Sequence, residues 1–209
     1  MLEDIINKIL GKKMIINKKS YLEESEIIDF TNKSIKALAQ ELSFNTSSKE
    51  EIVKNCFEYV RDEIKHSGDY KIDKVTCKAS EVLESKTGWC FAKAHLLAAL
   101  LRANSIPTAF CYQRLSCEEY KENLFSLHGL NAVYLEKFGW LKIDARGNKK
   151  EVDAQFIPPK EKLAFELNEK EFDLGVYYSN PLDIVIKALK ANSSYKQMID
   201  NMPDFKSTI

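Results

Sequence analysis

The sequence lacks an excess of charge of either sign. Its 209 residues include 31 lysines and arginines against 31 aspartates and glutamates, so the formal net charge is zero. Proteins that bind nucleic acid mainly by electrostatic attraction carry a strongly basic surface, so this class is excluded as the main function. With 44% hydrophobic and 30% charged residues, the composition also excludes a disordered or fibrous chain.

Long apolar segments are also missing. The longest nearly uninterrupted apolar run, Leu96 to Leu101, is far shorter than the roughly 20 residues of a membrane-spanning helix. The first residues, Met1 to Asp4, are acidic where a secretory signal is basic, and no apolar signal core follows. We therefore expect a soluble cytoplasmic protein, and the length favours a single domain, residues 1–209.

The cysteines form no recognisable framework. There are five, an odd number, and their spacing repeats no pattern typical of disulfide scaffolds or zinc sites. No acidic calcium-binding loop pattern is present either. We expect reduced thiols, no metal and no organic cofactor. A reduced cysteine is by default a small buried hydrophobe, and only an exceptional one is a nucleophile.

The sequence does contain a series of helical patterns followed by strand patterns. Helices are expected at 2–10, from 29 or 31 to 42, from the turn at 45–48 to about 64, and at 78–84, 90–103, 181–191 and 194–202. Strands are expected at 108–115, 127–136 and 139–145, with shorter β-like pieces at 14–16, 20–22 and 162–165. This order predicts an α+β fold with an antiparallel sheet, not a doubly wound α/β fold.

The segment Cys90–Ala103 is apolar nearly all round. Only Lys93, His95 and Arg102 interrupt it, and Pro107 follows shortly after its end. A helix with no polar face lies inside a domain, and the residue before a proline is pushed out of the helical region. We therefore predict a central buried helix over this segment.

Cys90 stands at the start of that helix, directly after Gly88 and Trp89. A thiol there faces unpaired backbone N–H groups and the positive end of the helix dipole, and both favour the thiolate. The same N–H groups can hold an oxyanion, and the glycine lets a substrate approach the backbone closely. Cys90 is a candidate nucleophile, and a cysteine that only packs in the core is the alternative.

A cysteine nucleophile needs a base, and the base needs an acceptor for its second ring nitrogen. His128 opens a predicted strand and Asp144 closes the next one, so these two are candidates. His95 lies about a turn and a half beyond Cys90 on the same helix and is expected to be a buried structural hydrogen-bonding residue. His66 lies in a loop, either on the surface or lining a cleft.

The sequence leaves the pairing of His128 with Asp144 open. A turn centred on Glu136 places them directly opposite each other on one face of a hairpin. A three-residue loop ending at Gly139 instead pairs Asp144 with Ala132, about 13 Å along the strand from His128 at roughly 3.3 Å per residue. A bulge or an earlier turn would then be needed to bring the two side chains together.

These segments, taken in order, resemble the transglutaminase-like superfamily. The matching segments are Thr87–Cys90, Leu100–Arg102, Ser105–Pro107, His128–Ala132 and Trp140–Asp144. The resemblance covers about residues 50–150 and implies a papain-like fold, in which the nucleophile helix packs on an antiparallel sheet. An N-terminal helical segment, 1–45, and a C-terminal helical extension, 155–209, flank this core. The resemblance implies Cys90 as nucleophile, His128 as base and acid, and Asp144 as the residue that orients His128.

Two positions depart from the family pattern. Gly129 and Leu130 follow His128, where an aromatic residue often stands two positions after the histidine. Ala145 and Arg146 follow the aspartate, where proline or serine is frequent. Neither change removes a catalytic atom, and we expect both to reshape the substrate groove.

Three further residues are substrate-binding or oxyanion candidates. Trp89 either walls the cleft or fills the core. The second oxyanion donor is Trp89, His66 or a backbone amide. Gln113 lies on the strand after the central helix, from which side chains can reach a substrate.

The expected function is thiol-dependent acyl chemistry on a peptide or protein amide, with hydrolysis by a cysteine protease or amidase as the first choice. Transfer to an amine, as in protein-glutamine transamidation, is an alternative. So is an N-acyltransferase similar to arylamine N-acetyltransferases. From another class, a non-catalytic module would use the groove to bind a peptide. Neither nucleic acid nor a membrane is an expected partner, and the sequence does not predict an oligomeric state.

Overall fold

The computed structural model describes residues 18–205, so the helix expected at 2–10 and the β-like piece at 14–16 lie outside the described residues. The helices are the 3-10 helix η1 (Lys18–Leu22), α2 (Lys33–Ser43), α3 (Lys49–Glu63), α4 (Ala79–Ser85), α5 (Cys90–Ala103), α6 (Asp183–Ala191) and α7 (Tyr195–Asp200). The strands are β1 (Lys65–His66), β2 (Thr87–Gly88), β3 (Thr108–Ser116), β4 (Phe125–Leu135), β5 (Gly139–Ile143), β6 (Gln155–Ile157), β7 (Lys160–Lys162) and β8 (Phe172–Asp173).

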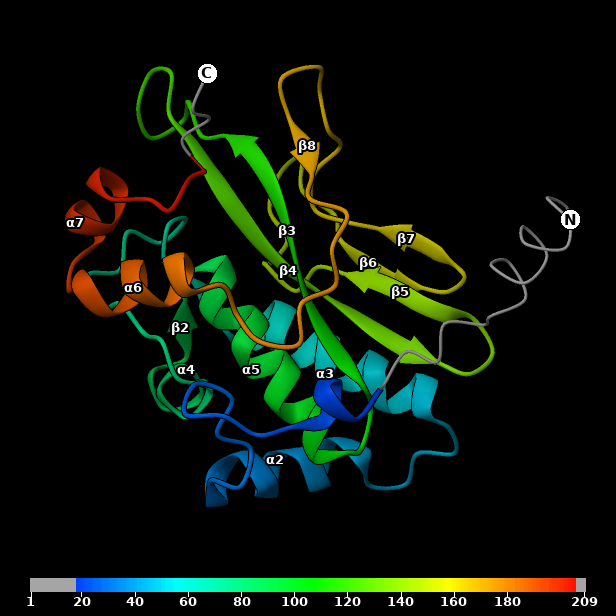
Figure 1. Ribbon diagram of the computed structural model, residues 1–209. Helices are drawn as coiled ribbons and strands as arrows, with labels where there is room; N and C mark the ends of the chain where they lie inside the picture. Colours follow the sequence, from blue (N-terminus) through cyan, green and yellow to red (C-terminus); the bar gives the residue numbers. More distant parts are fainter. Residues whose placement is uncertain (1–17, 206–209) are drawn as a thin grey trace, which may run out of the picture.

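Helix α5 forms the centre of the molecule (Figure 1). It contacts α2, α3 and α4 on one side and strands β3 and β4 on the other. All its residues from Cys90 to Arg102 are buried, which confirms the prediction made from its all-round apolar pattern. The large burial of this helix fixes its N-terminal end against the sheet.

The polar side chains on α5 have partners inside the core. Lys93 Nζ donates to the backbone carbonyls of Arg61, at 3.3 Å, and of Ile64, at the end of α3. His95 Nδ1 bonds the carbonyl of Cys77 at 2.8 Å. Burial lowers the pKa of His95 to about 4, so this histidine is neutral. It is the buried hydrogen-bonding residue that was expected.

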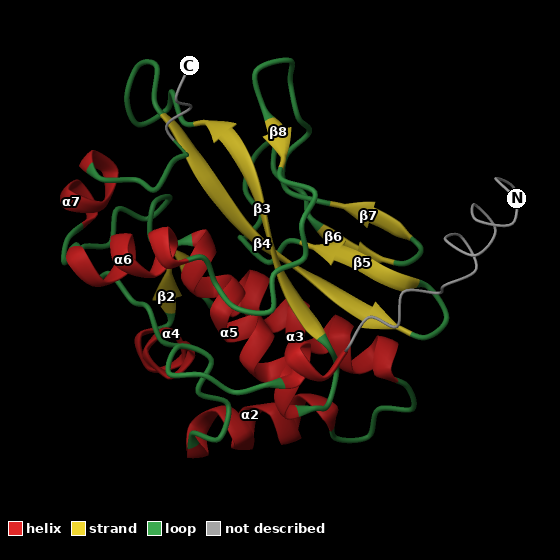
Figure 2. Cartoon of the chain, viewed as in Figure 1, coloured by secondary structure: helices red, strands yellow, loops and turns green. Residues whose placement is uncertain are grey.

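A four-stranded antiparallel sheet, in the order β5-β4-β3-β8, packs on α5. Strands β3 and β4 pair along their length, from Thr108 opposite Val133 to Ser116 opposite Phe125. Helices α2 to α5 precede this sheet in the chain, and α6 and α7 follow it. Figure 2 shows the helices in red and the strands in yellow. The α+β class predicted from the order of the elements is confirmed.

The β4–β5 hairpin has a register between the two expected ones. Leu135 pairs with Gly139 and Asn131 with Ile143, so the loop is 136–138 and Gly139, with φ of +77°, begins β5. Asp144 therefore follows the last paired residue and falls level with position 130, two residues from His128. Such diagonal neighbours are within reach of longer side chains. No bulge is required.

Two expectations at the N-terminal side are wrong in detail. Helix α2 is capped by Asn32, whose side-chain oxygen accepts the Ser34 N–H at 2.9 Å, and not by Asp29 or Thr31. Asp29 instead accepts hydrogen bonds from the backbone and the hydroxyl of Ser80. The β-like piece at 20–22 belongs to the 3-10 helix η1 and pairs with none of the described strands.

The strand expected at 162–165 is also misplaced. The β-structure there is the hairpin of β6 and β7, with Pro158 and Pro159 in its turn, and it ends at Lys162. The next residues leave the hairpin because they pack against the sheet: the Ala164 N–H donates to Asp144, and the Phe165 ring lies edge-on to His128. Among the described residues, no helix is long and apolar enough to cross a membrane.

Candidate active site

The N-terminus of α5 is open. Its first intrahelical bond runs from the Lys93 N–H to the Trp89 carbonyl at 2.9 Å, and the capping residue Trp89 makes no side-chain capping bond. The N–H groups of the first turn are therefore free to bind a ligand. Cys90 is the first helical residue and is 8% exposed. Its thiol thus lies beside donors that suit an anion.

A glycine permits the close approach of this helix end to the sheet. A Cβ at position 129 would lie 2.8 Å from Phe91 Cδ1 and 3.1 Å from Phe91 Cα, both too close for any other residue without a shift. Gly129 therefore lets α5 press against β4 one residue from His128. This contact sets how close Cys90 comes to the histidine.

His128 and Asp144 form a buried pair. His128 Nε2 donates to Asp144 Oδ2 at 2.7 Å, and both side chains are almost fully buried. The carboxylate also accepts the N–H groups of Arg146, at 3.1 Å, and Ala164, at 3.2 Å. These bonds fix the ring and leave Nδ1 of His128 for Cys90. The expected loop ending at Gly139 would have kept these two side chains apart, but they are in direct contact.

The electrostatics favour a charged thiolate–imidazolium pair. Burial raises the pKa of the Cys90 thiol, but the charge and hydrogen bond of His128, followed by the hydrogen bond of His66, lower it to about 6. Burial lowers the pKa of His128, but Asp144 and Cys90 together raise it to about 10. The same histidine outweighs burial and lowers the pKa of Asp144. At a pH between these two values the Cys90 thiol is ionised and the His128 ring is protonated.

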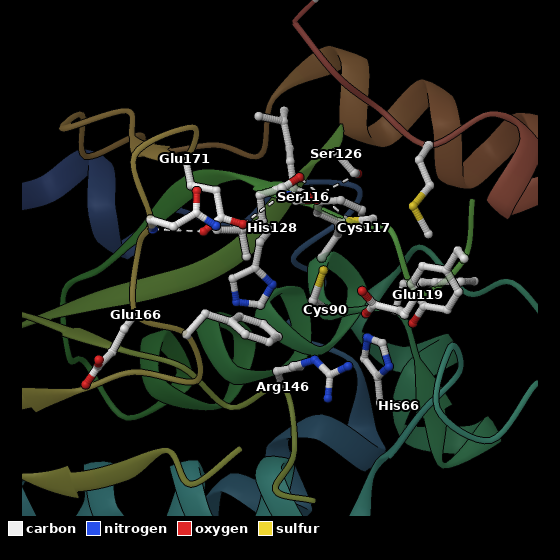
Figure 3. Close-up of a pocket in the computed structure, with 18 residues that line it drawn as sticks. His66, Cys90, Ser116, Cys117, Glu119, Ser126, His128, Arg146, Glu166 and Glu171 are labelled. Carbon is white, nitrogen blue, oxygen red and sulfur yellow. Dashed lines mark hydrogen bonds between the residues drawn. The ribbon is translucent and has the colours of Figure 1, made fainter. Parts of the chain in front are cut away.

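His66 lies on the opposite side of Cys90 from His128 (Figure 3). It is 5% exposed and lines the same pocket, so of its two expected positions the structure shows the cleft. The parallel pairing of β1 with β2 places His66 opposite Gly88, just before Cys90 in the chain. Two-residue strands carry no sequence pattern, so the sequence does not predict that His66 lies near Cys90.

The pocket above Cys90 has a volume of about 260 Å³. Cys90, His128, His66 and Trp89 line it. Trp89 is 2% exposed and stacks on Tyr195 with ring centroids 6.0 Å apart, so it both walls the cleft and belongs to the core. Gln113 is opposite His128 in the β3–β4 pair and buried, but it is not among the described residues that line this pocket.

Arg146 and Asp69 are site residues that sequence reasoning missed. Arg146 is buried, lines the pocket and makes a bidentate ion pair with Asp69 at 2.7 and 2.8 Å. Although burial raises the pKa of the Asp69 carboxyl, the neighbouring side chains of His66 and Arg146 hold it far below its usual range. In the sequence, Arg146 stands out only as a departure from the family pattern, two positions after Asp144. The ion pair of Arg146 with Asp69 links the loop after Asp144 to the segment that carries His66.

The other cysteines differ sharply from Cys90. Burial raises the pKa of Cys56, Cys111 and Cys117 to about 12, and that of Cys77 to about 11. These thiols stay protonated and unreactive at neutral pH. Within residues 18–205, no group of histidine, cysteine and acidic side chains is arranged to hold a metal ion.

A sequence profile of the transglutaminase-like superfamily matches residues 36–145, more than half of the chain. No curated protein matches the sequence significantly. Among solved structures, a protein from Cytophaga hutchinsonii described as a "Putative Cysteine Protease" is similar, with a TM-score of 0.50, 20% identity and coverage of 64% of this chain and 43% of that one. The periplasmic domain of TgpA from Pseudomonas aeruginosa has a TM-score of 0.45, 18% identity and coverage of 61% and 46%.

This chain therefore spans less than half the length of either solved structure. At such identities the likeness concerns the fold alone. It agrees with the profile match and confirms the transglutaminase-like, papain-like fold that the sequence motifs predicted.

Proposed function

Since this chain belongs to the transglutaminase-like superfamily, we propose that it is a thiol enzyme that cleaves an amide by acyl transfer through Cys90. His128 is the proposed base and acid, and Asp144 the residue that orients it. The observation that carries this proposal is the buried 2.7 Å contact between His128 and Asp144 in the pocket of an uncapped cysteine helix. A core cysteine that only packs needs neither the pair nor the pocket.

The proposed first step is attack of the Cys90 thiolate on the amide carbonyl carbon. A carbon–sulfur bond forms and the carbonyl π electrons move to oxygen, where free N–H groups at the start of α5 stabilise the charge. When the carbonyl re-forms, the carbon–nitrogen bond breaks and His128 transfers its proton to the leaving amine. Asp144 keeps His128 in position and stays ionised throughout. The product of this half-reaction is a thioester on Cys90.

Water is the first-choice acceptor of the acyl group, which makes the enzyme an amidase or cysteine protease acting on a peptide or protein. His128 then takes a proton from the attacking water, a carbon–oxygen bond forms to the acyl carbon, and the carbon–sulfur bond breaks to release the acid and restore the Cys90 thiolate. Transfer to an amine is the second candidate. Glu119, Glu166 and Glu171 line the same pocket, and their carboxylates would attract an ammonium group.

Acetylation by p-nitrophenyl acetate tests the proposal without knowledge of the natural substrate. We expect a burst of p-nitrophenol and an acetyl group on Cys90, located by peptide mass spectrometry. Cys90→Ala should abolish the burst, and His128→Ala should slow it by about 100-fold or more. Cys117→Ser is the matched control, because that thiol lines the same pocket but should not react.

Acetylation spread over several cysteines, or retained in Cys90→Ala, would favour a peptide-binding module on the same fold. Adding a primary amine to the acetylated enzyme then distinguishes the two candidate acceptors. Free acetate as the product indicates hydrolysis, and the acetylated amine indicates transfer.

A further inference from the structure

His66 is held beside the nucleophile by its backbone. The Lys65 N–H donates to the Lys86 carbonyl, and the Ser67 N–H donates to the Gly88 carbonyl, both at 3.0 Å. These two bonds flank His66 on either side and fix it alongside the residues that lead into α5. Its position relative to Cys90 is thus set by main-chain pairing and not by a flexible loop.

The imidazole of His66 is also held by packing. Its ring lies edge-on to Trp89 with centroids 5.7 Å apart. A Cβ at position 68 would lie 2.9 Å from His66 Cε1 and 2.5 Å from the hydroxyl oxygen of Tyr120, so Gly68 is what leaves room for the two rings. A side chain in such a confined place keeps one orientation.

Hydrogen bonding assigns the ring proton. The Asp69 N–H donates to His66 Nδ1 at 3.3 Å, so Nδ1 is an acceptor and the ring proton lies on Nε2. The Asp69 carboxylate is 3.5 Å from the same nitrogen. However, Arg146 binds this carboxylate at 2.7 and 2.8 Å and Lys149 at 2.9 Å, which offsets its charge. Nε2, the ring nitrogen that remains for Cys90, is therefore a hydrogen-bond donor.

We propose that His66 is a second catalytic histidine, which donates its Nε2–H to the oxyanion formed when Cys90 attacks the carbonyl. This role rests on the proposed acyl chemistry and differs from that of His128, because no proton is transferred. Before attack, the Nε2–H of His66 is hydrogen-bonded to the Cys90 thiolate. During attack the negative charge moves from sulfur to oxygen, and the hydrogen bond follows it. A neutral imidazole is a known type of electrophilic donor in enzymes.

Two reactions of the same thiol separate this role from a structural one. Alkylation by iodoacetamide displaces iodide at a saturated carbon and forms no oxyanion, whereas acetylation by p-nitrophenyl acetate forms one. Rates are compared on the plateau above the thiolate pKa, so that a shifted pKa in a variant does not affect them. The variants are His66→Ala, which removes the donor, and His66→Gln, which retains an amide N–H.

We expect His66→Ala to lower the plateau rate of acetylation by about 100-fold, as for loss of one oxyanion donor. Its plateau rate of alkylation should stay within about threefold of the wild type, and His66→Gln should recover part of the acetylation. Equal losses in both reactions, or unchanged acetylation, would overturn the proposed role of His66. The proposed roles of Cys90 and His128 would not be affected. A wild-type protein that is alkylated at Cys90 but never acetylated would contradict the proposed function itself.

Discussion

Asp144 acts through its charge as well as through its hydrogen bonds. The side chain is buried, accepts three hydrogen bonds and faces His128 across 2.7 Å. In a low-dielectric site the carboxylate stabilises an imidazolium, which in turn stabilises a thiolate. The ionisation of Cys90 thus depends on a residue that does not touch it.

Replacing this carboxylate should therefore change the titration of the thiol. We expect Asp144→Asn to raise the pKa of Cys90 by about one unit or more, because His128 loses the charge that raises its own pKa. The measurement is the pH profile of alkylation at Cys90. Asp173→Asn, which breaks the ion pair with Lys142 on the same sheet, is the matched control and should leave the profile unchanged. An unshifted profile in Asp144→Asn would contradict the coupling.

At the scale of elements, α5 was predictable to its end residues because an all-apolar segment bounded by a glycine and a proline allows one interpretation. The site around it was only partly predictable. Motif order gave Cys90, His128 and Asp144, but the hairpin register depended on a three-residue loop whose position the glycine signal misplaced by one residue. The short parallel pair β1–β2, which brings in His66, has no local pattern because both partners are two residues long.

Gly129 couples two elements, since it allows α5 to touch β4. We expect Gly129→Ala to push the helix start away from the strand, because the added Cβ meets the Phe91 backbone at 3.1 Å. The result should be slower alkylation of Cys90 at neutral pH and a lower melting temperature.

Gly175→Ala serves as the control. That glycine has a positive φ of +68° and nothing near its missing Cβ, so its replacement strains the backbone without moving α5. It should lower the melting temperature and leave Cys90 fully reactive. If both variants lose stability and neither loses reactivity, the contact between α5 and β4 does not determine the reactivity of Cys90.

At the scale of the whole molecule, the segment after α7 returns to the four-stranded sheet that carries His128. Arg114 binds the carboxylate of Asp204 at 2.7 and 2.8 Å, and the Pro203 carbonyl accepts the Leu127 N–H at 2.8 Å. Met202 lines the pocket. Residues far apart in the chain therefore complete one wall of the pocket. Helical periodicity predicts α7, but it does not predict that the residues after α7 pack against the sheet.

This arrangement predicts a measurable local opening. Asp204→Asn weakens the bidentate pair, and we expect hydrogen exchange of the Leu127 amide to accelerate about fivefold, as for loss of roughly 1 kcal/mol. Lys142→Ala, which breaks a similarly half-buried ion pair elsewhere on the sheet, should leave this amide protected. Unchanged exchange in Asp204→Asn would show that Arg114 does not hold the segment.

The measurement that tests the central claim most directly is the pH dependence of iodoacetamide labelling at each of the five cysteines, read by peptide mass spectrometry. We predict that Cys90 reacts fastest, with a midpoint near pH 6 set by its lowered pKa, and that its rate is constant above that midpoint. Cys56, Cys77, Cys111 and Cys117 should stay slow through neutral pH, because burial raises their pKa values. A Cys90 that is inert, or that titrates at about 8.5 like a free thiol, would contradict an assembled nucleophile and favour the peptide-binding module.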